Sequence, residues 1–202
     1  MDEAMASRIE AAAAVLRRGG IVVYPTETLY GLGARADDGP ALERLARAKL
    51  RAEGKPLPLI AADLAQVERV AVLAGAAARV AARLWPGPLT LVLPARAGVH
   101  PAITAGTGTV GVRIPGSEVA RVLAAAAGAP LVSTSANPSG GPPPSTVAAL
   151  APSLVEAVDH VLDGGPTPGG APSTVVEIGP DGSVRVLRAG AVEVDRVVEA
   201  AR

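Results

Sequence analysis

The amino-acid sequence predicts an α/β fold of three layers, in which a twisted, mixed sheet of parallel and antiparallel strands is flanked by helices. From Met5 to Asn137, short apolar runs alternate with Ala-rich segments of helical spacing, which favours a sheet covered on both faces. Three strand-like runs then follow without helices between them, which favours antiparallel strands as well. The 202 residues contain no internal repeat and no linker, so residues 1–202 are expected to form one domain.

The individual elements follow from the apolar pattern and from helix and strand end signals. The first half predicts five elements in order: helix 5–18, ended by Gly19 and Gly20, strand 21–25, helix 39–50, strand 56–63, and helix 64–71 with Asp63 as N-cap. In the second half, an Ala-rich helix is broken by Pro-Gly-Pro at 86–88, and a later helix, 117–128, is capped by Gly116 or Ser117. Strands are predicted at 89–94, 109–115, 129–137, 160–165, 173–179 and 183–190, and a closing helix at 191–202.

Composition argues against several classes of function. Only Trp85, Tyr24 and Tyr30 are aromatic, and the formal net charge is +0, which argues against a protein that stacks bases or binds a nucleic-acid backbone by bulk charge. The chain has no Cys, and His100 and His160 lie far apart without metal-ligand spacing. Neither a signal-like N-terminus nor an apolar stretch of about 20 residues occurs, so a cytoplasmic protein without membrane contact is expected.

Both lysines of the chain lie in one short segment. Lys49 and Lys55 flank Arg51 in "KLRAEGK", and every other basic residue is arginine. Three cations on a solvent-facing loop that leaves a helix suit a polyphosphate or a carboxylate. The segment lacks the GxxxxGK[ST] pattern, so a bound nucleotide would not be held by a P-loop. The alternative interpretation is a solvated loop without a ligand.

Two hydroxyl-rich segments follow predicted strands. Thr26 and Thr28 in "YPTETLYGLG" come directly after the first strand, at a sheet edge where ligands bind in α/β proteins. The segment "LVSTSANPSGG" carries four short polar side chains: Ser133, Thr134, Ser135 and Asn137. The GxSxG pattern of a nucleophilic serine is absent, so these groups are expected to hydrogen-bond a ligand's phosphate or carboxylate. The alternative for both segments is an ordinary turn capped by hydroxyl groups.

Arg113 is the one charge in the apolar strand "VGVRIP". A buried guanidinium needs either a bound anion or a carboxylate partner. The pattern therefore leaves two interpretations open, a ligand contact or a structural buried salt bridge.

Taken together, these segments resemble a known family. The stretches "YPTETLYGLG", "KLR", "WPGPLTLVL", "VGVRIP", "LVSTSANPSG", "PSTVVEI" and "VLRAG" occur in the order and spacing of the YrdC-like threonylcarbamoyl-AMP synthase family, from about Gly20 to Gly190. The chain resembles the short, single-domain type. The resemblance implies a nucleotidyltransferase that condenses L-threonine, bicarbonate or CO2, and ATP into threonylcarbamoyl-AMP and pyrophosphate. It also implies Mg2+ bound through the ATP phosphates rather than by side chains, and a downstream transferase system that modifies tRNA to threonylcarbamoyladenosine.

The resemblance further implies individual site residues. The Lys-Arg-Ser-Asn signature of the family, expected to be catalytic and to contact ATP, falls on Lys49, Arg51, Ser135 and Asn137. The L-threonine pocket is expected at Thr28, Arg113, Ser133 and Ser173, where Arg113 would pair with the substrate carboxylate. Further ATP contacts are expected at Lys55, Thr109 and Arg188.

This chain departs from the family pattern at two places, and two other functions compete. Ile60 stands where longer relatives carry a histidine, and the Pro142–Pro144 run stands where some carry a serine. One competing function is a YrdC-like carbamoyl-adenylate or O-carbamoyltransferase module, which normally lies within longer chains. The other is an RNA-binding protein of the same fold, with a weak tRNA contact, although the neutral net charge and the few aromatic residues disfavour it.

Overall fold

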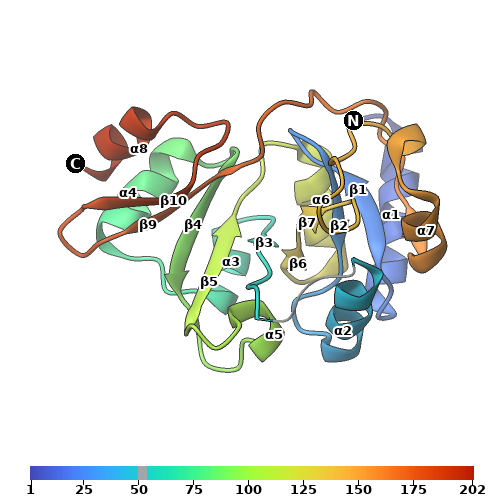
Figure 1. The fold of residues 1–202 in the computed structure, drawn as a ribbon, viewed down its shortest axis with the longest axis horizontal. Coiled ribbons are helices and arrows are strands. Elements are labelled where there is room, and N and C mark those ends of the chain that lie inside the picture. The colour runs from blue at the N-terminus through green and yellow to red at the C-terminus, as the bar shows by residue number, and fades with distance from the viewer. Residues whose placement is uncertain (50–53) are drawn as a thin grey trace.

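A computed structural model describes residues 1–49 and 54–202 (Figure 1). The helices are α1 (Glu3–Arg17), α2 (Gly39–Ala48), α3 (Leu64–Val70), α4 (Gly75–Leu84), α5 (Pro101–Thr104), α6 (Glu118–Ala127), the 3-10 helix η1 (Val147–Ala149), α7 (Pro152–Ala157) and α8 (Val194–Ala201). The strands are β1 (Val22–Pro25), β2 (Tyr30–Gly33), β3 (Leu59–Ile60), β4 (Leu89–Pro94), β5 (Thr109–Arg113), β6 (Leu131–Val132), β7 (Thr134–Ser135), β8 (His160–Val161), β9 (Thr174–Ile178) and β10 (Val184–Arg188).

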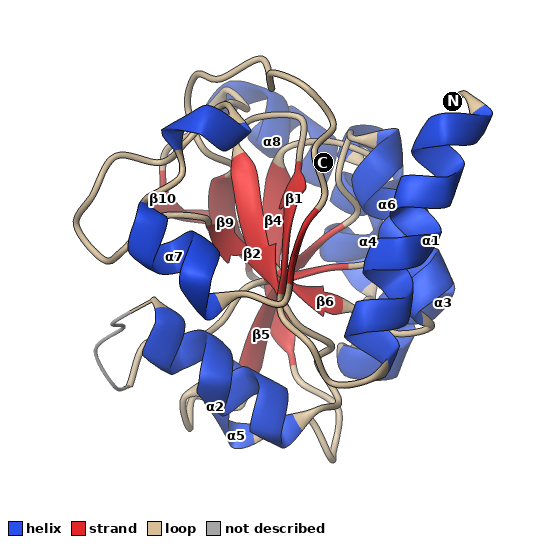
Figure 2. Ribbon diagram, turned by 90° about the vertical axis from the view of Figure 1, so that its right-hand side faces the viewer, coloured by secondary structure: helices blue, strands red, loops and turns tan. Residues whose placement is uncertain are grey.

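The predicted α/β class with mixed strand directions is confirmed. In the described ranges, a four-stranded sheet has the order β7-β2-β1-β8 and a six-stranded sheet the order β10-β9-β4-β5-β3-β6. Parallel pairs such as β4–β9 occur beside antiparallel pairs such as β9–β10. Figure 2 shows helices on both sides of the strands, with α1, α3, α4 and α6 on one side and α2, α5 and α7 on the other. The strands thus form the middle layer.

One detail differs from the prediction, because the strands divide between two hydrogen-bonded sheets instead of forming one. The predicted strand 129–137 is interrupted at Ser133, whose amide donates to the Pro58 carbonyl (2.8 Å). Before this point β6 pairs with β3, and after it β7 pairs with β2. The Val132 amide also donates to the Ala34 carbonyl, which follows β2 (2.9 Å). The segment therefore joins the two sheets and places Ser133 where they meet.

Small side chains bring α1 and α6 together on the outer face. Ala12 and Ala13 of α1 and Ala120 and Ala124 of α6 are fully buried in one apolar cluster, which lets the two helix backbones approach closely. The ends of the helices follow the sequence. The expected N-caps Asp63 and Ser117 accept hydrogen bonds from backbone amides in the first turns of α3 and α6.

Prolines and glycines explain two further differences. Strand 56–63 shrinks to the two residues of β3, because Pro56 and Pro58 have no N–H to pair with a neighbour. The segment expected to be a polar loop contains β2, whose Gly33 packs against the ring of Tyr24. A Cβ at Gly33 would lie 2.6 Å from Tyr24 Cε1, so glycine permits the close strand contact.

In the described ranges, no helix is both long enough and apolar enough to cross a bilayer.

Candidate functional site

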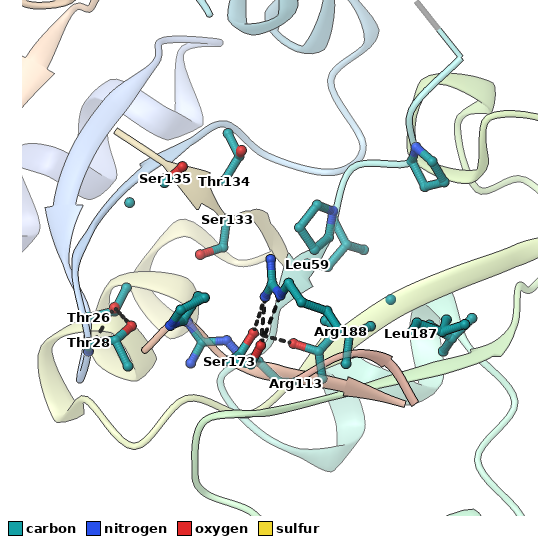
Figure 3. A pocket seen from close by; sticks show the side chains of 18 of the residues that line it. Thr26, Thr28, Leu59, Arg113, Ser133, Thr134, Ser135, Ser173, Leu187 and Arg188 are labelled. Atoms are coloured by element: carbon teal, nitrogen blue, oxygen red, sulfur yellow. Dashed lines mark hydrogen bonds between the residues drawn. The ribbon is translucent and has the colours of Figure 1, made fainter. Parts of the chain in front are cut away.

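A cavity of about 770 Å³ opens where the two sheets meet. One wall comes from the β1–β2 turn and the β6–β7 segment, and the other from β4, β5, β9 and β10 (Figure 3). Most of the site residues expected from the sequence line this cavity: Thr28, Thr109, Arg113, Ser133, Ser135, Ser173 and Arg188. Thr26 and Thr134 line it as well. The fold therefore gathers segments that are far apart in the sequence.

Three expected residues within the described ranges are not among those that line the cavity. Lys49 and Asn137 are buried, while Lys55 is exposed. Arg51 lies outside the described residues, so its predicted role stays a prediction.

The β1–β2 turn combines a structural hydroxyl with one that faces the cavity. Thr26 Oγ1 donates to the Leu29 carbonyl (2.7 Å) and accepts from the amides of Thr28 and Leu29. Thr26 thus stabilises the turn, as in the alternative interpretation of this segment. Thr28 also lines the cavity, with its hydroxyl 3.2 Å from Thr26 Oγ1, and unlike Thr26 Oγ1 it does not donate to the Leu29 carbonyl.

Arg113, the last residue of β5, forms the buried salt bridge that one interpretation expected, and its predicted ligand contact stays a prediction. Its side chain is only 8% exposed, and its Nη1 forms an ion pair with Oε1 of Glu27. No other side-chain partner of Arg113 occurs in residues 1–49 and 54–202. The guanidinium also lines the cavity. Arg113 is therefore a buried ion-pair partner whose remaining N–H groups can bind an anion.

A second arginine is held by Ser173. Arg188 Nη2 donates to the Ser173 carbonyl (2.7 Å) and to its Oγ (2.9 Å) (Figure 3). Burial and the positive charge of Arg113 lower the pKa of Arg188. Ser173 Oγ lies 3.0 Å from Oγ1 of Thr90. The two arginines thus bring positive charge to one cavity, which favours a ligand with more than one anionic group.

Sequence reasoning missed Thr90 as a part of this network. It is buried within β4 and lines the cavity. Its signal in the sequence was weak, since a lone threonine in an apolar strand is what β-propensity alone produces. The apolar part of the cavity wall, which was not predicted from the sequence, includes Pro58, Leu59, Pro143 and Pro172.

The expectation that Lys49 faces solvent on a cationic loop is wrong. The residue directly follows α2 and is only 5% exposed. Its Nζ donates to the carbonyls of Ser135 (2.6 Å) and Asn137 (3.0 Å) and lies 3.3 Å from Ser135 Oγ. An ammonium reaches these acceptors because it is compact and can direct three N–H groups. Lys49 therefore ties the end of α2 to the loop that carries Ser135 and Asn137.

Asn137 offers an acceptor that the described protein groups leave unused. Its Nδ2 donates to the carbonyls of Pro138 (2.9 Å) and Gly141 (2.6 Å), which fixes the orientation of the amide. Oδ1 is buried and has no hydrogen-bond partner in the described part of the chain. Because buried acceptors without partners are rare in native proteins, Oδ1 is a candidate for a ligand contact.

The cavity suits anionic ligands. Hydroxyl residues, three arginines (Arg113, Arg185 and Arg188) and one carboxylate (Glu177) line it, and its volume lies within the range of small-molecule sites. Across residues 1–49 and 54–202, no three His, Cys, Asp or Glu side chains gather as a metal site would require. Charge-assisted hydrogen bonds from such donors bind carboxylates and phosphates.

The chain is similar in sequence to a known protein family and to named members of it. A family model described as telomere recombination, covering Sua5, YciO and YrdC, matches residues 14–190. The chain is 41% identical over 172 residues to the threonylcarbamoyl-AMP synthase of Pyrococcus abyssi (strain GE5 / Orsay), covering 85% of this chain and 51% of the relative. It is 42% identical over 176 residues to the threonylcarbamoyl-AMP synthase of Chromohalobacter salexigens, covering 86% of this chain and 94% of the relative.

The chain is also similar to a solved structure over most of its length. The crystal structure of P. abyssi Sua5 complexed with L-threonine superposes with a TM-score of 0.86 at 37% identity, covering 95% of this chain and 56% of the other. The chain thus spans about half the length of the Pyrococcus relative.

Proposed function

Because the chain belongs to the Sua5–YciO–YrdC family, we propose that it is a threonylcarbamoyl-AMP synthase. The proposed reaction joins L-threonine, CO2 or bicarbonate, and ATP into threonylcarbamoyl-AMP and releases pyrophosphate. Residues 1–202 are proposed to act as one domain, with the two sheets sharing one cavity. Synthases from P. abyssi and C. salexigens carry this name at 41% and 42% identity, which supports the activity proposed for this chain.

The observation that carries the proposal is the combination of Arg113 with hydroxyl groups in one cavity. Arg113, Thr28 and Ser133 line it together. An arginine fork suits the α-carboxylate of an amino acid, and hydroxyl groups suit its ammonium and side-chain hydroxyl. Ser173, also in the lining, is proposed to complete the threonine pocket. The P. abyssi protein of similar fold was crystallised with L-threonine.

ATP is proposed to occupy the rest of the same cavity. Thr109, Ser135 and Arg188 line it, and they are proposed to contact the nucleotide with Arg51 and Lys55. Asn137 offers its unpartnered Oδ1, and Lys49 holds the loop that carries Ser135 and Asn137. The hydroxyl and guanidinium donors fit a triphosphate. When bound, Mg2+ would neutralise part of the phosphate charge.

The chemistry needs no side-chain nucleophile. The threonine amine attacks CO2, forms a C–N bond and loses a proton, which gives a carbamate. A carbamate oxygen then attacks the α-phosphorus of ATP, and the bond to the pyrophosphate oxygen breaks. The protein contributes orientation of the two substrates and stabilisation of the charge that develops on the phosphates. The product is proposed to pass to a threonylcarbamoyl transferase system that acts on tRNA, and the protein is proposed to work in the cytoplasm.

The purified protein should release pyrophosphate from ATP only when L-threonine and bicarbonate are both present. The reason is that the carbamate, which attacks the α-phosphorus, forms from these two substrates. A coupled pyrophosphate assay measures the rate, and mass spectrometry of the mixture identifies threonylcarbamoyl-AMP.

Serine, glycine and carbamoyl phosphate are tested in place of L-threonine in the same assay. Rates with serine or glycine equal to the threonine rate would contradict the proposed function. Pyrophosphate release with carbamoyl phosphate alone would instead indicate a carbamoyl-adenylate module.

A further inference from the structure

Glu27 is the one carboxylate of the β1–β2 turn, and the roles proposed above do not use it. It lies between Thr26 and Thr28, and its side chain is 16% exposed. Arg113 lines the cavity, whereas Glu27 is not among the lining residues. The carboxylate therefore contacts the guanidinium from outside the ligand cavity.

Three contacts, two from the segment before α6 and one from the end of β5, hold the Glu27 side chain. Its stem packs on Gly116, where a Cβ would lie 3.4 Å from Glu27 Cγ. Oε2 lies 3.4 Å from the amide of Ser117, the N-cap of α6, which donates to it. Oε1 accepts from Arg113 Nη1. The carboxylate is thus itself placed by the turn, the loop before α6 and the end of β5.

This ion pair uses only part of the guanidinium. Glu27 engages Nη1, while Nε and Nη2 of Arg113 have no partner in residues 1–49 and 54–202. The Nε–Nη2 edge is a fork that matches a carboxylate with two parallel hydrogen bonds. A ligand carboxylate and Glu27 can therefore occupy different edges of the same guanidinium at the same time.

We propose that Glu27 is a positioning residue, which orients the Arg113 guanidinium so that its free edge receives the α-carboxylate of the amino-acid substrate. This inference rests on the proposed function, since it assigns the substrate carboxylate to Arg113. A long side chain that is already held in one geometry loses less conformational freedom when a ligand binds to it. The ion pair with Glu27 orders the Arg113 side chain in the folded protein, before the substrate binds.

The opposite effect is physically conceivable, because Glu27 carries the same charge as the substrate carboxylate. If repulsion dominated, removal of the charge would strengthen threonine binding. Two variants separate these effects. Glu27→Gln keeps an acceptor oxygen for Arg113 but removes the charge, and Glu27→Met keeps the side-chain length but removes both.

L-threonine affinity should fall at least tenfold in Glu27→Met and stay within about threefold of wild type in Glu27→Gln. Isothermal titration with L-threonine and separately with ATP measures this, and ATP affinity should stay within about twofold in both variants. In the pyrophosphate assay, the threonine KM of Glu27→Met should rise while kcat changes little. L-threoninol, which lacks the carboxylate, should bind wild type and Glu27→Met equally.

A control is Glu10→Met, which removes another glutamate–arginine pair, with Arg17, on the exposed face of α1 and not among the residues that line the cavity. Its threonine affinity should equal that of wild type. If Glu27→Met does not fold, Glu27→Ala, which leaves room for water at Arg113, takes its place. Threonine binding by the folded variant as tight as in wild type, or tighter, overturns the inference. Absence of threonine binding by wild type overturns the proposed function and this inference together.

Discussion

Arg113→Ala should bind L-threonine about 100-fold more weakly than the wild-type protein and keep most of its affinity for ATP. Arg113 ends β5 and lines the cavity, and its Nε–Nη2 edge is proposed to hold the α-carboxylate. Loss of a charge-assisted pair of this kind costs about 2–3 kcal/mol, which corresponds to about two orders of magnitude in affinity. Calorimetric titration of each ligand measures the two affinities.

The same substitution should lower the melting temperature, because it leaves Glu27 without its arginine in a mostly buried position. Removing one partner of a buried ion pair leaves an uncompensated charge, which destabilises the folded state. The double variant Arg113→Ala/Glu27→Gln removes that charge and should recover part of the lost melting temperature. It should not recover threonine affinity. Recovery of both would show that Arg113 acts only as a structural partner of Glu27.

Much of the fold follows from local signals in the sequence. Asp63 and Ser117 cap helices as expected, because a short polar side chain before an apolar periodic segment has few other roles. The division into two sheets could not be predicted. It depends on where the Ser133 amide finds an acceptor, and that acceptor, the Pro58 carbonyl, belongs to a segment far away in the sequence.

The site was predictable to the extent that chemistry shows in residue type. Arg113 and the hydroxyls of Thr28 and Ser133 were singled out because polar groups in apolar surroundings need a reason, and all three line the cavity. The partner of Arg113 was not predictable, since nothing in "YPTETLYGLG" says that Glu27 turns away from the cavity toward β5. Thr90 was also hidden, because a threonine inside a strand needs no functional reason.

The burial of Lys49 shows where sequence reasoning fails most clearly. Three cations within seven residues are typical of a solvated loop, and burial of a lysine is rare unless its charge is compensated. The acceptors that compensate it are the backbone carbonyls of Ser135 and Asn137. Every residue has a backbone carbonyl, so the sequence does not indicate which carbonyls will surround the lysine.

Lys49→Ala should therefore lose both stability and activity, whereas a solvent-facing phosphate contact would cost activity alone. The substitution removes the Nζ donor from the carbonyls of Ser135 and Asn137. The Ser135 carbonyl keeps the Asn137 amide as a donor (2.9 Å), whereas the Asn137 carbonyl loses its Nζ donor. A buried carbonyl left without a donor costs about 1–3 kcal/mol, and for a chain of this size a loss of that order lowers the melting temperature by roughly 2–12 °C. A thermal melt beside the pyrophosphate assay measures both effects.

Lys49→Arg tests the geometry behind this prediction, because it keeps the positive charge. A planar guanidinium is larger than an ammonium and cannot direct its N–H groups to acceptors that converge within 2.6–3.3 Å of one nitrogen. The arginine variant should therefore resemble the alanine variant in its melting temperature and in its loss of activity. Lys55→Ala is the stability control, since Lys55 is exposed, and its melting temperature should match that of wild type. If Lys49→Ala melts like wild type, the contacts of Nζ with the Ser135–Asn137 loop do not stabilise the fold. If Lys49→Arg keeps full activity, positive charge alone is sufficient at this position.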